Sequence, residues 1–194
     1  RGGFYNEAID ILERHKPNGG DPRELGAAPM IGYTLGWHYA KNGNATKARA
    51  AVQKALKVSQ DYCFPNRLEE ISVLEYSIKI LPDCAWPYLH LGDLFYDRRR
   101  YREAIKLWES CLRLDPRNAT AWRSLGIAYF NILRSPQKAR SAYEEALAAD
   151  RSDARILYER DQLWKRLSVV PKKRLGELGR YPSLVARRDD LTIE

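Results

Sequence analysis

Cysteine, histidine and methionine are scarce in this chain. Its 194 residues include three cysteines, three histidines and one methionine. Cys63, Cys84 and Cys111 are odd in number and lack the C-x-x-C spacing of metal and redox sites, so they predict neither a disulfide framework nor a zinc site. The histidines have no acidic or cysteine partner at ligand spacing. We therefore expect no metal and no cofactor, and a reducing cytoplasm suits thiols of this kind.

Long apolar runs and catalytic motifs are also missing. No apolar stretch approaches the roughly 20 residues that span a bilayer. The sequence begins with Arg1 and has no signal-peptide core, which suggests a piece cut from a longer protein. There is no nucleophile elbow, phosphate-binding loop or pair of carboxylates in an apolar setting. These absences predict a protein that is not an enzyme.

Positive charge is in excess and lies toward the C-terminus. The formal net charge is +8, and basic pairs and triplets stand at 165–166, 172–174 and 187–188. Such a gradient can steer an acidic partner. A further run, 98–100, falls in a turn between two expected helices, where solvated charges are common. Without interleaved aromatic residues these runs make nucleic acid only a second alternative as a partner.

A repeat with a period of 34 residues dominates the rest of the sequence. Two blocks share an aromatic, a Leu-Gly pair and a second aromatic, and each is followed by an alanine and an aromatic four residues later. The first block has Tyr88, Leu91, Gly92, Phe95, Ala104 and Trp108; the second has Trp122, Leu125, Gly126, Tyr129, Ala139 and Tyr143. We expect each glycine and alanine to lie where two helices approach closely, with the aromatic rings filling the space between them.

This spacing resembles the tetratricopeptide (TPR) family, whose repeat has the pattern W-x2-L-G-x2-Y, A-x3-F and a closing proline. The resemblance implies an all-α fold: a right-handed solenoid of antiparallel helix pairs, with about four units here. Each pair is amphipathic and must stack on its neighbours to bury its apolar face. The predicted units are a partial repeat at 1–22, repeats at 29–62, 85–118 and 119–153, an irregular half repeat at 63–84, and a degenerate repeat with a C-terminal cap at 154–194.

The period breaks between Asp61 and Asp83. A single apolar stripe predicts one helix over 67–81, but the helix that should precede it is absent. The residues 61–66 stand in its place. Six extended residues cover about 20 Å, the length of a four-turn helix. We therefore predict that one helix is replaced by an extended segment near 61–66.

Three further stretches resemble a class of large bacterial TPR proteins in which a β-sandwich domain of uncharacterised function precedes the repeats. They are Asp61–Glu70, Asp161–Trp164 and Arg187–Leu191. This resemblance covers the chain from about Pro29 onward and often goes with carbohydrate metabolism. It implies no catalytic residue, because the β-sandwich is not in this chain.

In a TPR solenoid the first helix of each repeat lines a concave groove. The family register places an aromatic and basic set of side chains there, which suits a peptide or a partner helix. The candidate binding residues are Tyr33, Trp37, Trp86, Asp93, Tyr96, Arg123, Phe130, Tyr158 and Arg166. An alternative stays open for Trp86, Tyr96 and Phe130, which can instead pack against neighbouring helices or the C-terminal arm. The Lys and Asn clamp that holds C-terminal carboxylates in some TPR domains is absent.

The sequence thus predicts a non-enzymatic module that binds a peptide, a partner subunit or the upstream domain of its own parent protein. The first alternative is a structural scaffold in a larger carbohydrate-related protein. The second is nucleic-acid binding through the basic C-terminal end. The apolar end faces of a repeat stack also offer a route to homo-oligomers.

Overall fold

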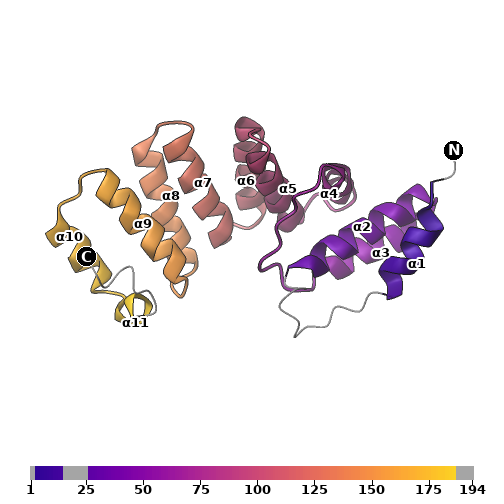
Figure 1. Cartoon of the computed structure of the whole chain (residues 1–194), viewed down its shortest axis with the longest axis horizontal. Coiled ribbons are helices and arrows are strands. Elements are labelled where there is room, and N and C mark those ends of the chain that lie inside the picture. Colours follow the sequence, from indigo (N-terminus) through magenta and orange to yellow (C-terminus); the bar gives the residue numbers. More distant parts are fainter. Residues whose placement is uncertain (1–2, 15–25, 187–194) are drawn as a thin grey trace. The chain divides into compact units, whose positions relative to one another are not determined.

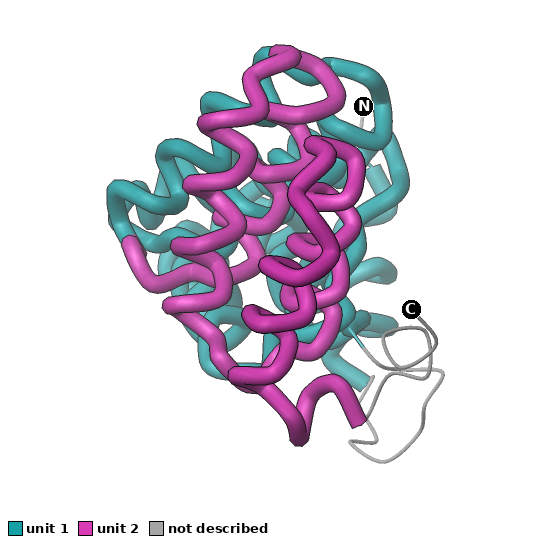
Figure 2. Tube along the Cα trace, turned by 90° about the vertical axis from the view of Figure 1, so that its left-hand side faces the viewer, with its two compact units in different colours: residues 1–114 teal, residues 115–194 magenta. Residues whose placement is uncertain are grey.

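All regular secondary structure in the part of the chain that the structure describes is α-helical, as predicted. The structure is a computed structural model and describes residues 3–14 and 26–186. The chain divides into two compact units, residues 1–114 and 115–194, which Figure 2 distinguishes by colour. No helix among the described residues is both long and apolar enough to cross a membrane.

Figure 1 shows the helices in chain order. The first unit contains α1 (Tyr5–Arg14), α2 (Ala27–Lys41), α3 (Ala45–Ala55), α4 (Glu69–Ile80), α5 (Ala85–Asp97) and α6 (Tyr101–Leu114). The second contains α7 (Ala119–Asn131), α8 (Pro136–Ala149), α9 (Ala154–Arg166), α10 (Pro171–Leu178) and α11 (Pro182–Val185). The helix predicted over 67–81 is α4. The end of the predicted partial repeat, from residue 15 on, and the stretch Arg187–Leu191 lie outside the described residues.

Helix α2 begins at Ala27, earlier than the predicted start at Pro29. Gly26 precedes it with φ at 79°, a left-handed conformation that glycine adopts without steric cost. Pro29 is then in the first turn of the helix, where its missing N–H has no carbonyl to bond. The predicted start of this helix at Pro29 is therefore wrong by part of a turn.

The pairs α2–α3, α5–α6 and α7–α8 pack as hairpins (Figure 1). Their close approach depends on glycine. A Cβ atom on Gly92 would lie 2.6 Å from Nε1 of Trp108, and one on Gly126 would lie 2.8 Å from the ring of Tyr143. Ala104 and Ala139, the small residues of the second helices, are fully buried. The packing predicted from the repeat is therefore confirmed.

Residues 56–68 form no helix, as the break in the period predicts. The segment predicted to be extended at 61–66 is not extended throughout, because Asp61 and Tyr62 form a turn in which Tyr62 has a φ of 58°. Gln60 anchors this segment. Its Nε2 donates to the carbonyl oxygens of Ala55 and Val58, both at 2.8 Å. Its Oε1 lies 2.9 Å from Nε2 of His90 on α5 and 3.4 Å from the hydroxyl of Tyr33 on α2. One side chain thus joins the end of α3 to α2 and α5 through partly buried polar contacts.

Helix α9 carries charge where the earlier repeats have Leu-Gly. Arg160 and Asp161 are 3% and 4% exposed. Asp161 accepts two hydrogen bonds from Arg174 of α10, one of them 2.9 Å from Nε to Oδ1. Arg160 donates to Glu144 of α8 at 3.0 Å. Ionic contacts therefore hold α10 against α9 in this unit.

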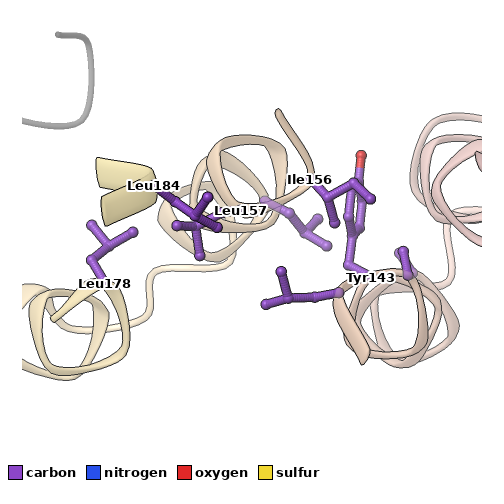
Figure 3. Close-up of a cluster of buried hydrophobic side chains, with 9 residues drawn as sticks. Tyr143, Ile156, Leu157, Leu178 and Leu184 are labelled. Carbon is purple, nitrogen blue, oxygen red and sulfur yellow. The ribbon is translucent and has the colours of Figure 1, made fainter. Parts of the chain in front are cut away.

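An apolar cluster completes the second unit (Figure 3). Tyr143 of α8 and Ile156 of α9 face each other at one end of it. Leu178 of α10 and Leu184 of α11 point toward Leu157 of α9 at the other end. These side chains are at most 8% exposed, so their burial fixes the short C-terminal helices on α9.

The two glycines with positive φ offer a matched stability test. Gly26 and Gly43 have φ of 79° and 78°. A Cβ on Gly26 would lie 1.9 Å from the carbonyl oxygen of Tyr62, whereas one on Gly43 would meet nothing within 4 Å. We expect Gly43→Ala to lower the unfolding free energy by about 1 kcal/mol, the cost of the left-handed conformation. Gly26→Ala should cost about 3 kcal/mol or more, because the clash adds to that cost. Urea unfolding measures both, and equal losses would contradict the tight contact at Tyr62.

The buried His90 predicts sensitivity to acid. Burial lowers its pKa from 6.5 to about 4. Above pH 6.5 the His90 ring is neutral in the folded and in the unfolded state. As the pH falls below 6.5, the ring takes up a proton in the unfolded chain before it does so in the folded protein. The unfolding free energy should therefore fall as the pH drops from 6.5 toward 4, by on the order of 3 kcal/mol in total. In His90→Gln this part of the loss should vanish. An unchanged pH profile in that variant, followed by circular dichroism, would show that another group controls it.

Candidate binding site

The nine candidate residues are divided between the two units. Tyr33, Trp37, Trp86, Asp93 and Tyr96 belong to the first unit. The remaining candidates, which belong to the second, are Arg123, Phe130, Tyr158 and Arg166.

In the first unit most of the candidates serve packing. Tyr33 is 0% exposed, and burial raises the pKa of its hydroxyl. It cannot line an open groove, which corrects the expectation from the repeat register. The physical reason is the irregular segment, whose Gln60 lies at the Tyr33 hydroxyl. In a regular repeat, a helix would replace the irregular segment, and a residue other than Gln60 would lie beside Tyr33.

Three other candidates of the first unit also contact neighbouring rings. Trp86 stacks on His90, with ring centroids 6.1 Å apart. The carboxylate of Asp93 accepts a hydrogen bond of 3.0 Å from Nε1 of Trp108. The ring centroid of Tyr96 is 5.4 Å from that of Trp108. These contacts favour the packing alternative for Trp86 and Tyr96.

Trp37 is the candidate of the first unit that borders a surface hollow. This hollow has a volume of about 400 Å³ between α2 and α4. Nζ of Lys41 lies 5.2 Å from the centroid of the Trp37 ring. Glu75 and Lys79 of α4 form the opposite side. The hollow thus carries charges of both signs, which offer little to distinguish one partner from another.

In the second unit the structure brings Phe130, Tyr158 and Arg166 together around one pocket. The pocket has a volume of about 360 Å³ and lies between α7 and α9, with Tyr143 of α8 contributing to its lining. Its lining comprises Gly126, Ile127, Phe130, Asn131, Tyr143, Tyr158, Glu159, Gln162, Leu163 and Arg166. None of these residues comes from α10 or α11, so the described part of the C-terminal arm does not line the pocket.

Glu159 organises the charged side of this pocket. Its carboxylate accepts two hydrogen bonds from Arg123, at 2.7 Å from Nε and 2.6 Å from Nη2. It also accepts one from the Tyr143 hydroxyl at 3.2 Å and one from Nε of Arg155 at 3.1 Å. Arg123 therefore acts on the pocket through Glu159 and does not line it. A paired fork of this kind holds the carboxylate in a fixed orientation.

The pKa shifts follow from these contacts. Burial raises the pKa of the Tyr143 phenol, and the charge of Glu159 raises it further. Burial alone would lower the pKa of Arg123, but its hydrogen bonds to Glu159 and the opposite charge outweigh this, so the pKa is raised. At neutral pH the phenol is thus a hydrogen-bond donor and the guanidinium stays charged.

Arg166 at the rim is in a different electrostatic position. Its side chain is exposed at the end of α9, and Cζ lies 6.0 Å from the centroid of the Phe130 ring. Within the described ranges no carboxylate is at salt-bridge distance from it. The rim thus presents a cation beside an aromatic face.

Sequence reasoning missed Glu159 and Tyr143 as pocket residues. A signal was present: Arg123 and Glu159 are opposite charges separated by 36 residues, about one repeat, on successive first helices. The repeat pattern identifies Tyr143 only as a packing residue. It serves both roles, because its ring contacts Gly126 while its hydroxyl reaches Glu159.

The pocket lining is made of apolar, aromatic and amide side chains with one carboxylate and one guanidinium. The described residues contain no cluster of three or more His, Cys, Asp or Glu side chains that could hold a metal. The carboxylate of Glu159 in the lining is already engaged by two guanidinium groups. Ring faces, the Asn131 and Gln162 amides and a rim cation are features of a binding surface.

The run of arginines at 98–100 is partly engaged in local contacts. Arg98 donates to the carbonyl oxygen of Asn66 and lies 3.5 Å from the carboxylate of Asp97. Arg100 donates to Glu103 at 2.7 Å, and its Cζ is 3.7 Å from the centroid of the Phe95 ring. These contacts fit a solvated turn and give no support to a nucleic-acid surface at this position.

Comparisons with known proteins identify the repeats. Two family profiles described as tetratricopeptide repeat match residues 33–62 and 89–154. The chain is 24% identical over 159 residues to the type IV pilus assembly protein PilF of Pseudomonas aeruginosa. That match covers 74% of this chain but only 63% of the length of PilF.

Solved structures show the same fold. MamA (41-end) from Desulfovibrio magneticus RS-1 is similar with a TM-score of 0.57 and 18% identity, covering 97% of this chain and 98% of that one. A thermophilic TPR protein of Thermus thermophilus is similar with a TM-score of 0.52 and 21% identity, covering 97% and 87%. These similarities confirm the predicted all-α repeat architecture; at such identities they carry no information about ligands.

The Arg123–Glu159 pair predicts a measurable loss on neutralisation. Both side chains are mostly buried, at 17% and 20% exposed. Glu159→Gln removes the charge opposite two guanidinium groups, and we expect the unfolding free energy to fall by about 1 to 2 kcal/mol. Glu145→Gln on the exposed side of α8 is the control and should change it by less than about 0.5 kcal/mol. Equal effects in denaturant titrations would mean that the pair does not stabilise this unit.

Proposed function

The chain belongs to the tetratricopeptide-repeat family, and on that premise we propose that it is a non-enzymatic binding module that holds a peptide segment of a partner protein in the α7–α9 pocket. Proteins of this family generally mediate protein–protein interactions. The pocket supports the specific proposal because it is concave and combines aromatic walls with a few polar groups. Peptide-binding surfaces need this combination of buried area and orientation.

One observation carries the proposal: three of the four candidates of the second unit meet at a single hollow. Phe130, Tyr158 and Arg166 come from helices α7 and α9, which are the first helices of successive predicted repeats. The supporting side chains are preorganised, since Arg123 and Tyr143 hold Glu159 in place before any partner arrives. Preorganisation lowers the entropy cost of binding.

We place the protein in the cytoplasm as part of the same proposal. Cys63, Cys84 and Cys111, which are all among the described residues, form no disulfide. Cysteines outside disulfides persist in reducing compartments, whereas small secreted domains commonly join them in pairs. The upstream β-sandwich implied by the bacterial resemblance stays a prediction.

The proposal can be tested with a phage-displayed library of random peptides selected on the whole chain. We expect selected peptides to bind wild type and to lose at least about tenfold in affinity for Phe130→Ala, because truncating a central aromatic anchor costs more than about 1 kcal/mol. Leu133→Ala is the control, since this exposed side chain just beyond α7 does not line the pocket.

Circular dichroism and urea titrations must show that both variants are folded. Peptides that bind Phe130→Ala and wild type equally would place the binding surface elsewhere. A library that yields no binder would favour the alternative in which the repeats only position another part of a larger protein.

A further inference from the structure

The charges and rings of the α7–α9 pocket indicate what kind of peptide it takes. We propose that it selects an internal segment in which a large apolar side chain stands next to an aspartate or glutamate. This inference rests on the proposed function and names the partner chemistry of the same site.

Positive charge exceeds negative charge at the pocket. Arg123 and Arg155 both donate to the single carboxylate of Glu159. Arg166 stands at the rim, and no carboxylate of the described part of the chain lies within salt-bridge distance of it. Arg123 and Arg155 thus share the Glu159 carboxylate, with the Asp153 carboxylate also acting on Arg123, whereas Arg166 has no such partner among the described residues. An incoming carboxylate would balance the remaining charge, and a cationic side chain would be repelled.

The apolar part of the peptide has its own place in the pocket. The walls are the rings of Phe130 and Tyr158 with Leu163 beside them. A hollow of about 360 Å³ accommodates one large side chain, and small pockets of this size bury most of what enters them. Arg166 lies over the Phe130 ring, so a carboxylate that meets this guanidinium is adjacent to the apolar side chain. The proposed peptide therefore carries the two groups at neighbouring positions.

The polar groups of the lining favour a segment that continues in both directions. Asn131 stands on α7 and Gln162 on α9, so an amide is available on each wall. Each amide can both donate to a carbonyl oxygen and accept from an N–H of a peptide backbone. Amides on both walls can bond a backbone that passes through the pocket. We therefore assign the carboxylate to a side chain within the peptide.

The test uses the same phage library, in which every displayed peptide is fused at its C-terminus and offers side-chain carboxylates alone. Selection is performed on wild type, on Arg166→Glu and on Arg151→Glu. Arg151 is exposed in the loop before α9 and does not line the pocket, so its variant carries the same change in net charge. Binding is then measured by fluorescence anisotropy for selected peptides and for versions with Asp or Glu changed to Asn or Gln.

We expect peptides selected on wild type and on Arg151→Glu to be enriched in an acidic residue beside a large apolar one. Neutralising that acid should weaken binding about fivefold, as for a partly exposed ion pair. Peptides selected on Arg166→Glu should carry Lys or Arg at the same place. Added salt should weaken the acidic peptides more than their neutral versions.

Several outcomes overturn the inference. Binders that require Phe130 but show no enrichment in acidic residues would leave the peptide-binding function intact and refute the acid selectivity. Selection of the same peptides by wild type and Arg166→Glu would also refute it. A labelled single-stranded RNA that binds as tightly as the best peptide and depends on Arg166 would show that the rim recognises phosphate instead. A library with no binder at all would remove the proposed function and this inference together.

Discussion

The positions of the side chains described above depend on the contact between a glycine on one helix and an aromatic ring on the next. At Gly126 there is no side chain, so the ring of Tyr143 can lie directly on α7. That position brings the Tyr143 hydroxyl to Glu159, and Glu159 in turn orients Arg123. A packing requirement of the repeat thus determines the arrangement of the α7–α9 pocket. The same contact in the first unit, between Gly92 and Trp108, is accompanied by a hydrogen bond from the indole to Asp93.

The repeat pattern predicted the regular part of the fold because spacing and packing are directly related there. The hairpins of α5–α6 and α7–α8 follow from glycine, alanine and aromatic positions that recur with the period. The absence of a helix around 61–66 was also predictable, since no apolar stripe exists for one. What the pattern could not provide was the path of the irregular segment. The register therefore assigns Tyr33 to a surface, although the side chain is buried with its hydroxyl at Gln60.

The α7–α9 pocket was predictable only in part, for a similar reason. Register places Phe130, Tyr158 and Arg166 on the first helices, and these three do line one hollow. Register says nothing about which charges meet across two helices. The two hydrogen bonds from Arg123 to Glu159 can be predicted only when the distance between α7 and α9 is known. The packing of α8 determines that distance. Likewise, the charged pair at 160–161 resembles a lost repeat motif, whereas the structure uses it to attach neighbouring helices.

Gln60 has a consequence for how such an array can change over time. Repeat proteins commonly gain, lose or exchange whole units, because each unit contacts only its neighbours. Here a single amide bonds to the end of α3, to His90 on α5 and to Tyr33 on α2. A standard repeat inserted in place of residues 56–84 would leave the His90 ring buried without this partner. The helices α2, α3 and α5 therefore depend on one another through this amide, and exchange of a single unit among them would break its contacts.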